Sequence, residues 1–339
     1  MNKYLQKLSL IIILLSLFNS CKTPQPCPDE TAPGNLGAPV NTGSDELAPS
    51  FSGQKLYLTE VKPEEPDEST LLYTELSDTS FAVPKADTAL PLRAFQGAGL
   101  PVFYQNELFF AAENRQADNP NSDIFHSEKI DGKWTDPKPL NNLNSASYDS
   151  HPAISSDGNY LVFASDRKGS LGDIDLYISK RNNDGTWSEA VNLGENINTE
   201  KTELSPHIDA LNNLYFSSKG YSQRNDHDIL KAPPSSEFRW MKAKPLRTPI
   251  NTEYNELGAF VVQNRIMLSS DRKGGCGGYD LYSFDLCGPV TLVGNVVRKS
   301  GDTPIEGYIE LYDSFGYLTA TKDIDKSGTF SFSLKPLEK

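Results

Sequence analysis

The fold of this chain is decided by the stretch SHPAISSDGNYLVFASDRKGSLGDIDLYISK, residues 150–180. It opens with a short strand that ends at Ser155 and turns at Asp157-Gly158, a pair that favours a hairpin. A second strand over 160–165 precedes a polar loop, and a third strand follows in which apolar side chains alternate. A further turn after residue 182 then predicts a fourth, outer strand over 186–191.

The same phrase occurs five times along the chain. Its copies are 52, 51, 54 and 53 residues apart, measured between the anchor residues Pro49, Pro101, Pro152, Pro206 and Ala259. A period of this length that contains only strand-like segments is typical of a β-propeller with one four-stranded blade per repeat. The sequence therefore predicts an all-β protein: a five-bladed β-propeller over 35–288, followed by a small, partial β-sandwich over 289–339.

The ring of blades also has a predicted closure. Residues 35–42 (NLGAPVNT) match 192–199 (NLGENINT), which form the end of an outer strand and its exit to the next blade. The last repeat lacks this element. We therefore expect residues 33–41 to supply the outer strand of the fifth blade and so remove a free sheet edge.

Three tryptophans stand at one fixed position of successive repeats. Trp134, Trp187 and Trp240 are each 53 residues apart, before the predicted fourth strand. A large aromatic residue that recurs at one blade position is expected to pack between neighbouring blades and not to serve as a platform for a ligand.

The first 34 residues carry a targeting pattern. Two lysines precede the apolar run 8–18, which is too short to span a membrane, so residues 1–20 are predicted to be a signal peptide. The end of this run, Leu17-Phe18-Asn19-Ser20-Cys21, resembles a bacterial lipobox. The resemblance implies an acylated Cys21 and a lipid anchor in the outer membrane. Residues 22–34 contain four prolines and no apolar periodicity, so 21–34 is predicted to be a proline-rich tether. The alternative is an ordinary secretory peptide cleaved near Ser20, with Cys21 incidental.

The charge of the chain excludes some partners. The formal net charge is −13, and it becomes −15 when residues 1–20 are removed, because they carry two lysines and no acid. Nucleic acid and anionic lipid both require a basic surface, so neither is an expected partner. A basic protein patch or a divalent cation suits this charge better.

The loop that follows the second strand of each repeat has a sequence similar to that of a known family of repeats. Ser165-Asp166-Arg167-Lys168-Gly169 with Asp175-Leu176-Tyr177, and the matching Asp271, Arg272 and Asp280 with their neighbours, resemble the WD40-like repeats of TolB. They are still more similar to repeats in OmpA-family and type IX secretion-associated lipoproteins of Bacteroidetes. The segment 289–339 resembles the carboxypeptidase regulatory-like domain, of which about half to two-thirds would be present.

The acidic and cysteine residues allow several interpretations. Two Asp-x-Asp pairs, Asp173/Asp175 and Asp226/Asp228, recur at one blade position, and Asp280 matches their second members. We therefore expect these aspartates to brace loops and not to act as catalytic or metal-binding carboxylates. Calcium in the loop 166–175 is an alternative, although the loop lacks an EF-hand register. Cys276 and Cys287 form a candidate disulfide, with two free thiols as the alternative, while Cys27 has no obvious mate.

The remaining candidates lie beside the anchor prolines. His151 and His207 are expected to face the central channel, where they could serve as polar residues at its mouth. A metal site would need a third ligand, which the sequence does not identify. The chain has no nucleophile elbow, Walker loop or dinucleotide fingerprint, so we predict no catalytic residue, no cofactor and no metal.

These patterns lead to a functional prediction. The resemblances imply a periplasmic, outer-membrane-anchored lipoprotein that is not an enzyme and acts as a protein-interaction scaffold, with envelope proteins as partners. The loops 60–70 and 113–122 differ between blades and are the predicted contact regions. The alternative is a glycan-binding or glycoside-active propeller that uses the central funnel. Non-repeated carboxylates on the funnel floor would favour the alternative, and small residues would favour the scaffold.

Overall fold

The computed structural model describes the greater part of the propeller and four strands beyond it. The described residues are 32–65, 69–76, 80–92, 99–114, 121–236, 238–262, 264–286, 290–296, 307–312, 318–324 and 328–334. All regular secondary structure in these ranges is β-strand, and they contain no helix long and apolar enough to cross a membrane. The signal peptide, Cys21 and the tether were predicted for residues that lie almost entirely outside this set, as do parts of the loops 60–70 and 113–122.

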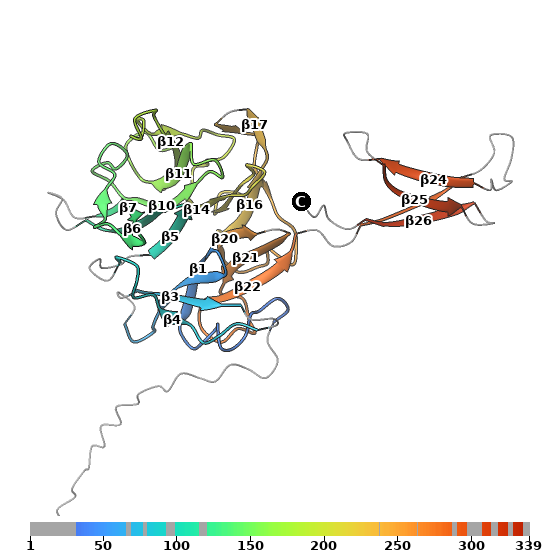
Figure 1. Ribbon diagram of the computed structural model, residues 1–339, viewed down its shortest axis with the longest axis horizontal. Helices are drawn as coiled ribbons and strands as arrows, with labels where there is room; N and C mark the ends of the chain where they lie inside the picture. The colour runs from blue at the N-terminus through green and yellow to red at the C-terminus, as the bar shows by residue number, and fades with distance from the viewer. Residues whose placement is uncertain are drawn as a thin grey trace, which may run out of the picture.

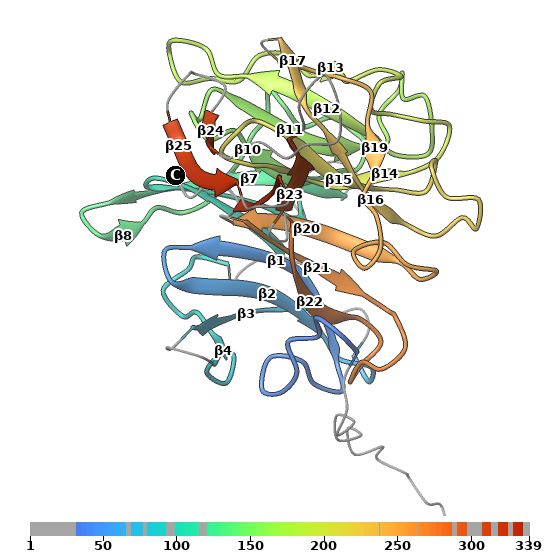
Figure 2. The same ribbon diagram turned by 90° about the vertical axis from the view of Figure 1, so that its right-hand side faces the viewer.

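Five antiparallel sheets surround a common axis, as Figures 1 and 2 show. The first blade contains β1 (Asp45–Ser52), β2 (Lys55–Val61), β3 (Ser69–Glu75) and β4 (Lys85–Ala86). The second contains β5 (Gly99–Tyr104), β6 (Glu107–Glu113), β7 (Ser122–Ile130), β8 (Lys133–Trp134) and β9 (Lys138–Pro139). The third contains β10 (Asp149–Ile154), β11 (Tyr160–Ser165), β12 (Asp175–Lys180) and β13 (Val191–Asn192).

The fourth and fifth blades complete the ring. The fourth contains β14 (Glu203–Ile208), β15 (Leu214–Ser218), β16 (Asp228–Ala232) and β19 (Lys244–Pro245), with an added hairpin of β17 (Pro234–Ser236) and β18 (Arg239–Trp240). The fifth contains β20 (Glu256–Val262), β21 (Arg265–Ser270) and β22 (Asp280–Asp285). Each inner strand contacts the inner strands on both sides, and β20 returns to β1. The predicted all-β fold with a five-bladed propeller is confirmed.

The chain closes the ring as predicted. Asn35 forms an antiparallel bridge with Tyr282 of β22, and the amide of Leu36 donates to the carbonyl of Leu281 over 3.0 Å. In the third blade, Asn192 pairs with Tyr177 in the same way. The segment before the first blade therefore occupies the outer position of the fifth blade.

The outer strands are shorter than the sequence suggested. A strand was predicted over 186–191, but β13 contains only Val191 and Asn192, and Trp187 forms an isolated bridge with Arg181. The reason is that the indole of Trp187 is buried in the core instead of alternating along a ladder. The outer strands β9 and β19 end in Pro139 and Pro245, which cannot donate to a further strand, so the rim is a poor template for edge pairing.

The hydrophobic core lies between blades. Trp187 of the third blade packs edge-on against Phe109 of the second, with ring centroids 6.0 Å apart, and Trp240 of the fourth packs against Tyr160 of the third at the same distance. Trp134 joins the cluster between the first and second blades, 6.4 Å from Phe103. The structure thus places all three tryptophans at interfaces between blades, where each contributes its large apolar surface to joining neighbouring sheets.

The strands after the propeller form two antiparallel pairs. β23 (Val290–Asn295) pairs with β26 (Thr329–Leu334), and β24 (Gly307–Tyr312) pairs with β25 (Leu318–Ile324). These pairs are compatible with a small β-structure after the propeller. The predicted boundaries and the carboxypeptidase regulatory-like domain remain predictions.

Candidate functional site in the axial funnel

Every inner strand carries a β-bulge at the same place. The register of pairing shifts within β1, β5, β10, β14 and β20, next to the anchor residue. In four of them the residue before the anchor has a positive φ: 54° for Ala48, 53° for His151, 52° for Ser205 and 63° for Gly258. Because a bulge bends its strand and redirects side chains, it helps to shape the wall around the axis.

The five inner strands enclose a funnel of about 460 Å³ along this axis. Four half-buried aromatic side chains line it: Phe51, Phe103, Tyr104 and Phe260. The rings of Phe51 and Phe260 lie 5.8 Å apart, although they come from the first and fifth blades. A concave, mostly apolar space with a few polar groups is the usual form of a small-molecule site.

Two imidazoles belong to the polar part of the wall, which also contains Gln105 and the serines Ser50, Ser155, Ser156 and Ser205. His207 lies 4.3 Å from the ring of Phe260 and donates from Nε2 to the carbonyl of Val261 over 3.2 Å. His151 places Nδ1 3.3 Å from the hydroxyl of Tyr148. Desolvation lowers the pKa of each imidazole to about 4, so both are neutral at pH 7. The prediction that these two histidines face the channel is confirmed.

Among the residues that the structure describes, no carboxylate, lysine or arginine lines the funnel. The nearby turn residues Asp157 and Asp209 each accept hydrogen bonds from the backbone amides of their own turn. Burial alone would raise the pKa of Asp157, but hydrogen bonds from Ser155 and Asn159 outweigh it and lower the pKa. These carboxylates therefore brace the hairpins at the funnel mouth.

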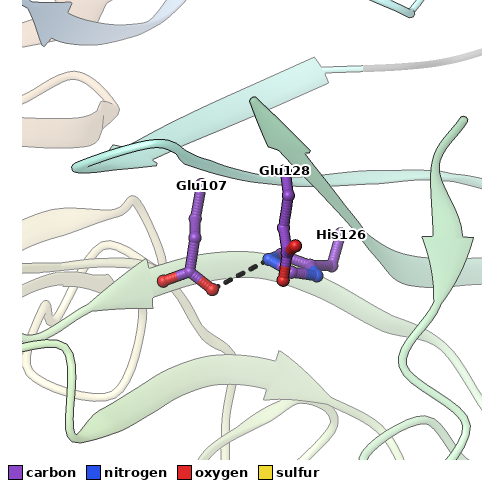
Figure 3. A group of neighbouring side chains, drawn as sticks. All are labelled: Glu107, His126 and Glu128. Carbon is purple, nitrogen blue, oxygen red and sulfur yellow. Dashed lines mark hydrogen bonds and ion pairs between the residues drawn. The ribbon is translucent and has the colours of Figure 1, made fainter. Parts of the chain in front are cut away.

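A second cluster lies on blade two, and Figure 3 shows its three side chains together. Glu107 faces Glu128 across β6 and β7, and His126 Nε2 lies 2.9 Å from Glu107 Oε1. The ligand atoms of the three residues lie within 4.8 Å of one another, close enough to hold a metal ion. However, Arg181 of the third blade donates to both oxygens of Glu107, over 3.1 and 2.9 Å. Because the guanidinium already supplies the positive charge, the cluster is better described as an ion pair that joins two blades.

The repeated loop residues lie away from the funnel and brace the blades. Asp175 accepts from the amides of Leu171 and Gly172, and Asp280 accepts in the same way from Cys276 and Gly277. Asp166 and Asp271 accept from the amides of Tyr148 and Asn255 at the start of the inner strands.

Two arginines of the same motif bind backbone carbonyls and buried acids. Arg167 donates to the carbonyl of Leu143 and to Asp149, and Arg272 donates to two carbonyls and to Glu256. The motif that carries the family resemblance is therefore occupied by contacts that hold the blades.

Of the two cysteines in the predicted disulfide, only Cys276 lies among the described residues. Cys276 is disulfide-bonded. Its partner is one of the other three cysteines, which all lie outside the described residues: Cys21, Cys27 and Cys287. The pairing of Cys276 with Cys287 therefore stays a prediction.

The sequence-based prediction of the site did not include the aromatic wall. Phe51, Phe103 and Phe260 follow their anchor residues by one or two positions, where other blades carry aliphatic or small residues. Attention to residues that differ between repeats, in place of those that recur, would have identified them.

Comparisons with known proteins agree on the fold. No protein-family model and no curated protein matches the chain. The arabinofuranosidase PaAbf62A from Podospora anserina, solved with cellotriose, aligns at 11% identity and a TM-score of 0.50, over 78% of this chain and 100% of its own. A thermostable family-43 glycoside hydrolase aligns at 14% identity and a TM-score of 0.49, over 73% and 91%. TolB from Acinetobacter baumannii aligns at 15% and 0.40, over 76% and 63%.

These comparisons correct the functional prediction. The expected non-enzymatic interaction scaffold rested on lipoprotein resemblances, whereas the propeller aligns over 78% of this chain with an arabinofuranosidase. The scaffold prediction and the prediction that the protein is not an enzyme are therefore withdrawn, and the glycan-directed alternative is taken up as a proposal. At this identity the likeness establishes a shared fold, and the named activities belong to those proteins.

Proposed function

We propose that this protein binds a carbohydrate in the axial funnel. The observation that carries the proposal is the combination of four aromatic rings with two neutral imidazoles around a space of about 460 Å³. An aromatic face packs against the C–H face of a sugar ring, while a neutral imidazole can donate to or accept from a hydroxyl. The shared architecture with an arabinofuranosidase supports this choice of ligand class.

Binding is the part of a glycan-directed function that the described residues support. Acid-assisted cleavage of a glycosidic bond uses a carboxyl group whose pKa is raised, together with a second carboxylate. In the cluster on blade two, burial would raise the pKa of Glu107, but hydrogen bonds from His126 and Arg181 outweigh it and lower the pKa. Asp157 is lowered by its own turn. Release of reducing sugar should nevertheless be measured in the same samples.

The test is calorimetric titration with cellohexaose, xylohexaose and arabinohexaose. We expect at least one to bind, and Phe260→Ala to weaken its Kd about 5- to 10-fold, since one aromatic contact contributes about 1 kcal/mol. Tyr308→Ala is the matched control, because this aromatic side chain is 63% exposed on β24, outside the funnel. The proposal fails if no oligosaccharide binds the wild-type protein, or if Phe260→Ala binds as tightly as the control.

Attachment to the outer membrane through Cys21 is a separate part of the proposal. The lipobox-like end of the apolar run supports it. An acylated form facing the periplasm would meet envelope proteins as partners. Metabolic labelling with a fatty acid should mark the wild-type chain and not Cys21→Ser, and labelling of both would contradict the assignment.

A further inference from the structure

The two funnel histidines interrupt the regularity of the repeats. His151 stands immediately before its anchor proline, where the other described blades with a positive φ carry Ala48, Ser205 and Gly258. His207 stands immediately after its anchor, at the position of Ser50 in the first blade and Ala153 in the third. At the positions equivalent to His151 and His207, other blades carry small residues, so the fold accepts small residues there. Each imidazole is therefore not required for blade formation.

His151 also has an unfavourable backbone conformation. Its φ of 53° lies in the left-handed region, which disfavours most side chains other than glycine. Backbone strain of this kind tends to occur at functional sites, where the surrounding structure maintains it. A bulky side chain placed there, when small residues suffice in other blades, indicates a role for the imidazole itself.

The hydrogen bonds determine what each ring can offer. A carbonyl can only accept, so the bond from His207 to Val261 puts the proton on Nε2 and leaves Nδ1 as an acceptor. A phenol is the stronger donor in the pair of Tyr148 and His151, so His151 Nδ1 accepts and Nε2–H remains as a donor. Among the described residues, neither remaining nitrogen has a protein partner. The wall thus presents one donor and one acceptor beside aromatic rings.

We propose that His151 and His207 make the funnel selective for uncharged, hydroxyl-rich sugars over acidic ones, with His151 donating and His207 accepting. This inference rests on the proposed carbohydrate function. Hydroxyls can satisfy both partners at once, whereas a carboxylate can only accept and would face the lone pair of His207. The described wall contains no lysine or arginine to balance a carboxylate, and the chain has a net charge of −13. A desolvated anion without a partner would be strongly disfavoured.

The experiment compares neutral and acidic ligands on the full-length protein. The neutral hexasaccharide that binds best is titrated beside oligogalacturonate of the same length at pH 7. We expect the acidic ligand to bind at least 10-fold more weakly. Equal or tighter binding of oligogalacturonate would overturn the inference while leaving carbohydrate binding intact. Binding of neither ligand would overturn the proposed function and this inference together.

Substitutions taken from the sister blades test the residues. His151→Ser and His207→Ala introduce side chains that the fold already carries at these positions, so both variants should fold with unchanged unfolding midpoints. Each should weaken neutral-sugar binding about 5- to 10-fold, the effect of one lost hydrogen bond. The preference over oligogalacturonate should shrink in parallel. His126→Gln, which changes a histidine outside the funnel, should retain both affinities.

A measurement without ligand provides an independent check. Nitrogen-15 NMR at pH 7 should show both imidazoles neutral, with the proton on Nε2. An imidazolium signal, or a proton on Nδ1 of His207, would remove the acceptor on which selectivity depends. Unchanged neutral-sugar affinity in both sister-blade variants would likewise overturn the proposal.

Discussion

The first and fifth blades each bury a glutamate at the same position, but the surroundings of its carboxyl group differ. Glu46 and Glu256 each stand three residues before their anchor, with exposed fractions of 1% and 0%. Each accepts hydrogen bonds from the amide and hydroxyl of a threonine four residues earlier, Thr42 or Thr252. Their local folds are therefore alike.

The two carboxylates differ in what lies across the strand. Glu256 pairs with Ser270, and Arg272, two residues further on, donates to Glu256 Oε1 over 3.0 Å. Glu46 pairs with Glu60, and Glu46 Oε2 has no hydrogen-bond partner among the residues that the structure describes. Burial raises the pKa of both carboxyls, to about 8 for Glu46, whereas the guanidinium of Arg272 opposes the rise in Glu256. The same position is thus an ion pair in one blade and a neutral acid in its neighbour at pH 7.

The largest effect should follow removal of the cation from the fifth blade. Arg272→Met would leave Glu256 buried without its partner and two carbonyls without donors, and should reduce the free energy of unfolding by about 3–5 kcal/mol in urea titrations. Lys62→Met, at the equivalent but exposed position of the first blade, should change it by less than about 0.5 kcal/mol. Equal losses of unfolding free energy in the two variants would contradict the conclusion that only the fifth blade depends on a buried ion pair.

The next effect concerns replacement of each glutamate by glutamine, which should change stability in opposite directions in the two blades although both pKa values are raised. A carboxyl with a raised pKa binds its proton more tightly in the folded chain, so its contribution is full below pH 4.5 and is lost as the pH rises toward 8. Glu46→Gln should therefore flatten this decline and raise stability at pH 9 by on the order of 2–3 kcal/mol. Glu256→Gln should destabilise at pH 7, because Arg272 loses its counter-charge. Urea titrations at pH 5, 7 and 9 measure both, and a stabilised Glu256→Gln would contradict the comparison.

A smaller loss of stability should follow replacement of either of two equivalent asparagines, and the amide that loses protection should differ between them. Asn41 exchanges hydrogen bonds with the amide and carbonyl of Leu281 across the ring closure, and Asn198 does the same with Leu176 inside the third blade. Replacement of either by alanine should cost about 1–3 kcal/mol, since buried polar groups lose their partners. Hydrogen exchange should show faster loss of the Leu281 amide in Asn41→Ala and of the Leu176 amide in Asn198→Ala. Protection that persists at Leu281 would show that Asn41 does not hold the closure.

The smallest effect is expected at the partly exposed ion pair between the second and third blades. Arg181→Met should cost about 1 kcal/mol or less, because water and salt screen the pair with Glu107 more than they screen Arg272 with Glu256. The loss should shrink further in 0.5 M salt, whereas the loss in Arg272→Met should persist. Thermal unfolding at low and high salt distinguishes the two.

The sequence specified the architecture because the propeller depends on recurring positions. Strand alternation, Asp-Gly turns and a period near 53 residues predicted the blades, and the match of 35–42 to 192–199 predicted the closure. The length of the outer strand was wrong, since apolar patterning alone does not show that Trp187 turns into the core. Packing against a neighbouring blade decided that segment.

The functional prediction was wrong for a related physical reason. Its resemblance rested on residues such as Asp166 and Arg167, which bind backbone groups and buried acids within their own blade. Residues of this kind report how a blade is built and not what the ring binds. His151 and His207 were identified because of their places beside the prolines. The aromatic wall was not, because its members come from different blades and form a band only after the ring closes.

The closure also bears on how this chain can be cut and rejoined. Since Asn35 pairs with Tyr282, the beginning and the end of the propeller lie side by side. A short linker between them would produce a circular permutant whose new ends could be opened at the exposed turn after Lys180. The cyclic order of the blades would be preserved, and with it the neighbours of every inner strand. The propeller should therefore fold to the same ring of blades whichever blade the chain begins with.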